Sequence, residues 1–454
     1  MKPAKSFSAE INAARTYCLD LLRKYDTPSS LLLPYIPSHA RDAYVALRAF
    51  NIDVARTADT TSTPTIGMMR LQFHKDAVTK SLAGTPPKQP IALLLANAAQ
   101  LVSQRSSGKS KFTKSWFMRI IDTREKYLSN PPYPNMASLE SYAENTYSTL
   151  LYLTLQALPM ASVTADHIAS HIGKAIGISA VLRGLPLIAF PGPGNSHSNQ
   201  GGMGGDMPAT RHRAVMLPLD VMAEAGVREE DVLRNAARAE GLRDAVFTVA
   251  TRANDHLITA RQMLDNIRAG HDAGHEFEHQ DEEEHVHIPS TFSTGRSETP
   301  AQEIERAFGV FMPAVATQMW LDRLQKFDFD VFQPKLRVTD WKLPFKAYWA
   351  YNMIDGIPGL VRSFVATRPP LTFYAWKGSW NLRDLLECLR LRHVNRRQFR
   401  RSEKAEIGKA VATSFQRKPP IACQVILLVL APPIDPTSLM RTRLIMAVTL
   451  SAYR

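Results

Sequence analysis

Cysteine is scarce in this chain, and so are long apolar runs. The 454 residues include only Cys18, Cys388 and Cys423, which are too few and too scattered for a disulfide framework or a cysteine-ligated zinc site. The longest apolar run, 421–431, falls short of the roughly 20 residues that a membrane-spanning helix needs. We therefore expect a protein of a reducing compartment and predict no membrane-spanning segment.

Motifs of nucleophilic catalysis and of nucleotide binding are also missing. The sequence contains no Gly-x-Ser-x-Gly elbow. The glycines at 192–205 are not followed by the Gly-Lys-Ser/Thr that completes a phosphate-binding loop. The alternation typical of strands is scarce before residue 350, whereas apolar residues recur there at helical spacing. The sequence therefore predicts an all-α fold.

Helical periodicity accounts for most of the chain, and Asn, Ser or Thr often precedes a periodic segment, as expected of helix N-caps. We predict helices over 8–26, 39–57, 65–83, 89–104, 112–129, 137–158, 164–183, 217–225, 228–235, 239–268, 299–325 and 342–351. Two segments without an apolar period, about 190–213 and 270–298, are predicted to be loop insertions. The second contains HDAGHEFEHQDEEEHVH, which has metal-ligand side chains but favours a solvated acidic loop.

Positive charge is concentrated at the end of the chain. The whole sequence has a net charge of +13, and residues 353–454 hold 17 basic and 6 acidic residues, a net of +11. Such a segment can bind an anionic membrane or a nucleic acid. We favour a poorly ordered or misassigned extension, and we expect no nucleic-acid partner.

The segment 165–183 is the most informative part of the sequence. Ile168, Ile172 and Ile176 fall on one helical stripe, and small residues such as Gly173 allow close contact with a neighbouring helix. This pattern predicts a buried helix. The residues Arg-Gly-Leu-Pro at 183–186 predict that it stops there, because glycine can adopt the left-handed cap and proline cannot continue the helix.

Together with 214–235, this segment resembles the trans-isoprenyl diphosphate synthases, in particular squalene and phytoene synthases. The matching positions are Gly173, Ala175, Leu182, Arg183 and Leu217-Pro218. In those enzymes two acids, four residues apart on one helical face, hold the magnesium ions that neutralise a prenyl diphosphate. The resemblance places these acids at Gly184 and Ile188, and the accompanying Gln and Asn at Gly177 and Ala180.

The first acidic motif of the family follows an Ala-Phe pair, which matches Ala49-Phe50. Its acids then fall at Ala55 and Asp59, so that only Asp59 is retained. It lies in a turn-like sequence where a short acid is common without any metal. The resemblance thus implies a chain that has lost the metal ligands and binds no cofactor or metal.

Longer blocks are similar to one branch of the family, the mitochondrial assembly factors for respiratory complex I; they lie at 46–55, 65–78, 119–128, 139–158, 166–186, 217–227, 327–334 and 343–351. The resemblance implies an isoprenoid-synthase-like bundle with a central cavity over residues 10–352. It also implies a non-catalytic role on the matrix face of the inner mitochondrial membrane, with peripheral membrane association. The implied partner is a core membrane subunit of complex I or its assembly intermediates. Two alternatives stay open: an active prenyl transferase, and a prenyl- or lipid-binding protein.

If the resemblance holds, a small set of polar residues lines the former substrate pocket. His171 and Lys174 continue a helical stripe from His167, a spacing that also suits two zinc ligands, although no third ligand is placed by the sequence. A polar lining is the favoured interpretation. The predicted pocket residues are Asp59, Tyr142, Asn145, His171, Lys174 and Arg183.

Overall fold

The computed structural model describes residues 4–61, 63–160, 162–191, 213–271 and 299–352. Within these ranges every regular element is a helix, apart from an isolated bridge between Tyr133 and Pro218. The predicted all-α fold is therefore confirmed. All described residues belong to one compact unit of the chain.

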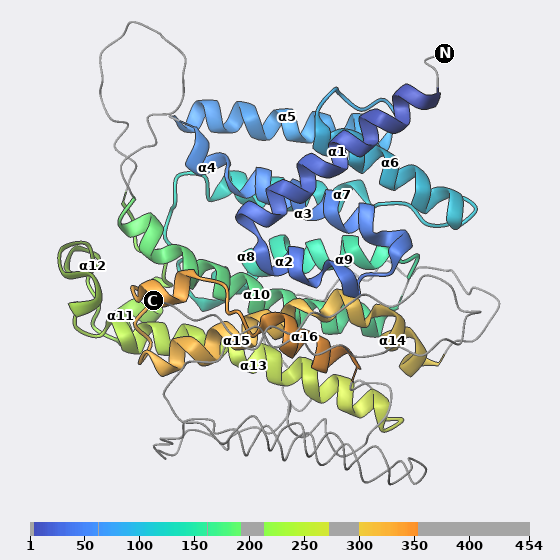
Figure 1. The fold of residues 1–454 in the computed structure, drawn as a ribbon. Coiled ribbons are helices and arrows are strands. Elements are labelled where there is room, and N and C mark those ends of the chain that lie inside the picture. Colours follow the sequence, from blue (N-terminus) through green and yellow to red (C-terminus); the bar gives the residue numbers. More distant parts are fainter. Residues whose placement is uncertain (1–3, 62, 161, 192–212, 272–298, 353–454) are drawn as a thin grey trace, which may run out of the picture. The chain divides into compact units, whose positions relative to one another are not determined.

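The first half of the bundle is built from helices that precede residue 160 (Figure 1). They are α1 (Ala4–Tyr25), α2 (Thr27–Leu32), α3 (Arg41–Ala55), α4 (Thr57–Thr60), α5 (Pro64–Leu82), α6 (Pro90–Arg105), α7 (Lys114–Lys126), α8 (Met136–Ala143) and α9 (Thr149–Gln156). A single π-helical turn, η3 (Glu144–Ser148), joins α8 to α9. Short 3₁₀ turns at η1 (Leu33–Tyr35) and η2 (Ser38–Ala40) precede α3.

The second half begins with α10 (Val163–Ala189), which contacts α8, η3, α9, α13, α14 and α15. The remaining helices are α11 (Leu219–Glu224), α12 (Glu229–Asn235), α13 (Leu242–Arg268), α14 (Pro300–Phe311), α15 (Pro313–Lys326) and α16 (Leu343–Asn352), with 3₁₀ turns η4 (Ala236–Arg238) and η5 (Pro334–Arg337). Figure 1 shows α10 between α8 and α9 on one side and α13 on the other.

Local sequence explains where many of these helices begin. The side chains of Thr63, Asn135 and Ser162 accept hydrogen bonds from backbone N–H groups in the first turns of α5, α8 and α10. Proline occupies the start of α5, α6, α14 and α15, where its missing N–H has no helical partner to lose. Pro313 also divides the helix predicted over 299–325 into α14 and α15.

Two large apolar clusters form the core, and α10 contributes to both. Its N-terminal half provides Ile168 and Ile172 to the cluster shared with α1, α3, α6 and α9. Its C-terminal half provides Ile178 and Leu182 to the cluster shared with α8, α11 and α13. α10 is also long and apolar enough to cross a membrane, but 72% of its apolar window is buried inside the protein. Such burial is typical of a core helix.

The predicted helix stop at 183–186 is wrong, because α10 continues to Ala189. Gly184 does not adopt the left-handed conformation that a glycine cap requires. Pro186 within the helix costs about 3 kcal/mol through its lost hydrogen bond and its ring clash. Burial of Leu185 and Ala189 in the last turn offsets a cost of this size, since one buried leucine contributes about 2 kcal/mol.

The contact between α10 and the π-helical turn is unusually close. A Cβ atom added to Gly173 would lie 2.3 Å from the Cα atom of Ser148, and one added to Gly177 would lie 2.4 Å from the Cβ atom of Ala143. The Ser148 hydroxyl donates to the Ser170 carbonyl at 2.9 Å. Glycine is therefore required at both positions by the approach of a neighbouring backbone.

Several sequence predictions concern residues that are not described. The predicted loop insertions at 190–213 and 270–298, with the histidine-rich tract, lie almost entirely outside the described residues. The tail 353–454 lies outside them as well. The predicted domain boundary at residue 352 stays a prediction.

Alanine substitutions separate the two kinds of glycine in α10. We expect Gly173→Ala to lower the free energy of unfolding by about 2 kcal/mol or more, because the new methyl group meets a backbone rather than a flexible side chain. The control is Gly184→Ala, whose Cβ would lie 3.9 Å from its nearest neighbour and which should be neutral or stabilising by up to about 1 kcal/mol. Urea unfolding measures both. Destabilisation by Gly184→Ala would contradict a continuous α10.

Candidate functional site

Three arginines extend from different helices into the interior. Arg48 comes from α3, Arg124 from α7 and Arg183 from α10. Arg48 is only 4% exposed, and its guanidinium lies 5.3 Å from the centre of the Tyr44 ring. Its Nε and Nη2 atoms are buried without a hydrogen-bond partner. Burying a guanidinium group without hydrogen-bond acceptors costs free energy of folding. An anionic group bound beside Arg48 would remove this cost.

Arg124 is held by neutral groups rather than by a carboxylate. It donates hydrogen bonds to the Tyr142 hydroxyl and, at 3.5 Å, to the Asn51 side-chain oxygen. Its guanidinium lies 5.3 Å from the Tyr142 ring centre and 5.4 Å from that of Tyr147. Its Nε atom is buried without a partner. Asn51 lies three residues after Arg48 on α3, so Arg124 approaches the helix that carries Arg48.

Arg183 comes from α10 and lies near Tyr147, which also contacts Arg124. Its guanidinium lies 5.6 Å from the Trp320 ring centre. Burial lowers the pKa of Arg183, whereas the nearby Tyr147 and Asp26 raise it. Among the described residues, none of the three arginines forms a salt bridge with an acid. Tyr142 contacts Arg124, and Tyr147 lies near both Arg124 and Arg183. We name Arg48, Arg124 and Arg183, together with Tyr142 and Tyr147, the arginine cluster.

A second polar cluster connects α8, α10 and α13. His171 and His256 lie with their Nδ1 atoms 3.0 Å apart, and His256 Nε2 lies 3.1 Å from a Glu140 carboxylate oxygen. One consistent arrangement has His171 donating to His256, which in turn donates to Glu140. Arg252 donates a charge-assisted hydrogen bond to the same carboxylate. We name these four residues the Glu140 cluster.

The Glu140 cluster is electrostatically balanced. Burial raises the pKa of Glu140, but the hydrogen bonds and charges of His256 and Arg252 outweigh it and lower the pKa to about 2. One oxygen of the carboxylate, Oε1, thus has both His256 and Arg252 as partners. A neighbouring acid, Glu144 in η3, accepts hydrogen bonds from Tyr152 at 2.6 Å and Ser170 at 2.8 Å. Both acids that face α10 from α8 and η3 therefore have structural partners.

The predicted pocket residues separate into several groups. Tyr142 and Arg183 belong to the arginine cluster, and His171 belongs to the Glu140 cluster. Lys174 is buried one turn further along α10. Asp59 is exposed on the short helix α4, so it is not part of either buried cluster. The predicted central cavity stays a prediction.

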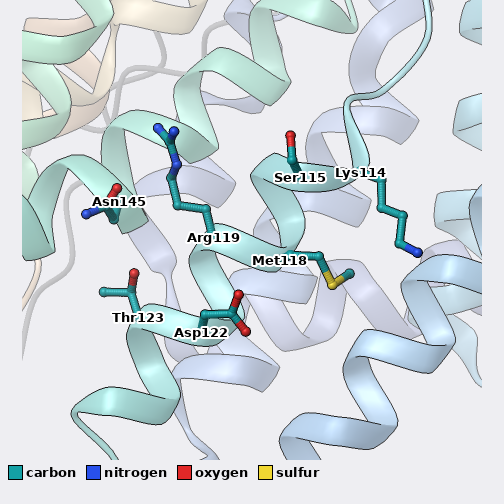
Figure 2. A pocket seen from close by; sticks show the side chains of 7 residues that line it. All are labelled: Lys114, Ser115, Met118, Arg119, Asp122, Thr123 and Asn145. Atoms are coloured by element: carbon teal, nitrogen blue, oxygen red, sulfur yellow. The ribbon is translucent and has the colours of Figure 1, made fainter. Parts of the chain in front are cut away.

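Asn145 lies at a pocket of about 650 Å³ that is open to solvent. Figure 2 shows the lining residues, six of which come from α7 while Asn145 approaches from the π-helical turn. Arg119, Asp122 and Thr123 provide polar groups to this pocket. Asp122 is also paired with Lys75 at 2.7 Å. Asn145 is therefore a surface residue of η3 and is not brought together with the buried candidates.

Sequence reasoning missed Arg48, Arg124 and Glu140. One signal was present for Arg48: in the segment YVALRAF it is a single arginine within an apolar run, and a charged residue there must be buried or paired. No comparable signal identifies Glu140, because its partners are more than a hundred residues away. No group of three or more His, Cys, Asp or Glu side chains suited to a metal ion occurs in the described ranges.

The Glu140 cluster makes a pH-dependent contribution to stability. Its folded-state pKa of about 2 lies below the ordinary 4.5, so the stabilisation is complete above pH 4.5 and is lost as the pH falls toward 2. We expect Glu140→Gln to lower the free energy of unfolding by about 2 kcal/mol at neutral pH, because the half-buried Arg252 and the buried His256 lose their charged acceptor. The difference from wild type should shrink between pH 4.5 and pH 2.

Urea unfolding over this pH range measures the effect. The control is Glu224→Gln, which removes an exposed carboxylate on α11 and should change stability little at any pH. Equal stability of Glu140→Gln and wild type at neutral pH would show that the ion pair contributes nothing.

Comparison with known proteins adds an independent observation. Residues 22–342 match the family model of squalene/phytoene synthase. The chain is 36% identical over 338 residues to "NADH dehydrogenase (ubiquinone) complex I, assembly factor 6" of Mus musculus, covering 74% of this chain and 82% of that protein. The protein of the same name from Homo sapiens is 35% identical over 332 residues, covering 73% and 80%.

A solved structure shows the same fold. A dehydrosqualene synthase in complex with a ligand superposes with a TM-score of 0.53 and 13% sequence identity, covering 79% of this chain and 98% of that one. The predicted isoprenoid-synthase-like arrangement of helices is thereby confirmed. At this identity the likeness extends to the fold alone.

Proposed function

The chain belongs to the squalene/phytoene synthase family, and from its similarity to the complex I assembly factors within it we propose that it supports assembly of respiratory complex I without transferring prenyl groups. The observation that carries this proposal is the identity of 35–36% to those assembly factors over most of the chain. The solved synthase with the same fold is only 13% identical.

The side chains at the expected metal positions support a non-catalytic role. Magnesium requires oxygen ligands, and departure of a diphosphate requires neutralisation of its charge. Gly184 and Ile188 lie in the last turns of α10, and Ala55 ends α3; none of them carries a side-chain oxygen. The nearby acids Glu140 and Glu144 are engaged by protein partners.

The proposed location is the mitochondrion, on the matrix face of the inner membrane with peripheral attachment. The proposed partner is a core membrane subunit of complex I or an assembly intermediate that contains it. Both follow from the names of the relatives and from the branch of the family that the sequence resembles. No nucleic acid, metal or cofactor is required by this role.

A second candidate function is favoured by the arginine cluster. Two of its guanidinium groups have buried nitrogens without partners, and their positive charge is not balanced by an acid. A phosphate or diphosphate group would supply the missing acceptors through charge-assisted hydrogen bonds. The assembly factor would then bind a prenyl or lipid ligand through its anionic head. This role is compatible with assembly and differs from catalysis.

Deletion of the gene tests the assembly role. We expect native gels of the deletion strain to show reduced complex I with accumulated assembly intermediates, while other respiratory complexes are built normally. Expression of the wild-type chain should restore complex I. The Glu140→Gln variant serves as a stability control. If it restores less complex I only because it is less stable, the loss of complex I should match the lower amount of the variant protein in the cell. Normal complex I in the deletion strain would show that the proposed role is wrong.

Inorganic diphosphate tests the ligand-binding role. At a concentration about tenfold above its Kd, we expect it to stabilise the wild-type protein by about 1.4 kcal/mol. Arg48→Met with Arg124→Met should lose this stabilisation, and Arg48→Met alone should be neutral or stabilising without ligand, since it removes an unpaired buried charge. The matched control is Arg234→Met with Arg238→Met, which removes two exposed arginines. Equal stabilisation of both double variants would exclude the arginine cluster as the site.

A further inference from the structure

The last described helix and the segment before it expose large apolar side chains together. Trp341 is 73% exposed, Val338 66%, Tyr348 46% and Phe345 42%. Trp341, Phe345 and Tyr348 follow one another at spacings of four and three residues, so they lie on one face at α16. The rings of Trp341 and Phe345 are 6.2 Å apart and nearly perpendicular. Trp341 and Phe345 therefore form one apolar surface, with Tyr348 on the same face and Val338 three residues before Trp341.

This exposed face is opposite the face that packs into the protein. Leu343 and Ala347 are buried, and they join an apolar cluster with Leu32, Met312 and Met319. α16 is thereby fixed on α2 and α15. The orientation of the exposed aromatic side chains follows from this packing. Ordinary surfaces carry single apolar residues, whereas a contiguous patch marks an interaction site.

Positive charge surrounds the aromatic side chains. Between residues 335 and 346 the chain has four basic residues and one acid, Asp340, a net charge of +3. The basic residues are Lys335, Arg337, Lys342 and Lys346, all of them exposed. The Lys342 amino group lies 5.6 Å from the Trp341 ring centre. Lysine stems can lie along apolar surface while their charged ends reach toward anionic groups.

We propose that this surface, formed by Val338, Trp341, Phe345 and Tyr348 with Lys342 and Lys346 beside them, attaches the protein to an anionic lipid bilayer. Tryptophan and tyrosine favour the boundary between headgroups and acyl chains, and the lysines pair with lipid phosphates. The choice of a membrane as the partner rests on the proposed function. The identification of the surface rests on the exposure of its apolar side chains and on the positive charge beside them. The basic surroundings favour an anionic lipid over a neutral one.

A second exposed apolar set provides a matched control. On α5, Met69 is 69% exposed and Phe73 46%. Their neighbourhood lacks exposed tryptophan, and Lys75 is engaged by Asp122 and Glu125 at 2.7 Å. This set includes Phe73 and an exposed Arg70, which donates to Thr60, but it has no tryptophan and fewer free basic side chains than the surface at α16. We expect it to contribute nothing to lipid binding.

Vesicle binding by the full chain tests the proposal. Vesicles of phosphatidylcholine with cardiolipin should capture the protein in a flotation assay, and vesicles of phosphatidylcholine alone should capture less. Trp341→Ala with Phe345→Ala should lower partitioning about tenfold or more. Lys342→Glu with Lys346→Glu should remove most of the preference for cardiolipin. Met69→Ala with Phe73→Ala should bind like wild type.

Quenching by brominated acyl chains locates the contact. Bound wild-type protein should be quenched more than bound Trp341→Phe, because Trp341 enters the bilayer. Three outcomes would each overturn the proposal: vesicle binding undiminished in the Trp341→Ala/Phe345→Ala variant, an equal loss of binding in the α5 control, or quenching unchanged by Trp341→Phe. Each of them would point to another surface or to a protein partner. If the protein binds vesicles normally but does not restore complex I in the deletion strain, the proposed function is contradicted. The proposal that this surface binds a membrane would still hold.

Discussion

The close approach of α10 to the π-helical turn is the contact on which the interior of this protein depends. Gly173 allows the backbone of η3 to lie where a side chain would otherwise be, and Gly177 does the same for Ala143 at the end of α8. Tyr147 lies within this turn and Tyr142 just before it, and both rings lie beside Arg124. The contact joins α10 to the segment that carries Glu140, Tyr142 and Tyr147. A larger side chain at Gly173 would therefore disturb the core and the candidate site at once.

The two polar clusters differ in how their charge is balanced. The Glu140 cluster contains an acid with two cationic or hydrogen-bonding partners, as a structural ion pair requires. The arginine cluster contains three guanidinium groups that contact tyrosine and tryptophan rings, the Tyr142 hydroxyl and the Asn51 amide. Its residual positive charge is an energetic cost for folding. Such a cost at a buried position is typical of a binding site, where the ligand supplies the opposite charge.

Sequence patterns predicted the helical class and most helices, because apolar periodicity directly reflects the burial of one helical face. They were wrong about the end of α10, because the burial of Leu185 and Ala189 outweighs the local effect of Pro186. They indicated Tyr142 and Arg183 only through a family resemblance. The pairing of Glu140 with Arg252 and His256 could not be predicted, since it is created by helix packing across long sequence separations.

Family membership alone does not distinguish a synthase from an assembly factor. The distinction depends on whether this chain can hold the magnesium that neutralises a leaving diphosphate. Of the positions where the family resemblance places the acids, Ala55, Gly184 and Ile188 carry no side-chain oxygen, and Asp59 retains an acid. Release of pyrophosphate from farnesyl or geranylgeranyl diphosphate, with magnesium present, tests this most directly. The account predicts no release above that of a heat-denatured sample. Sustained release that is lost in Asp59→Ala would contradict it and identify the chain as an active prenyl transferase.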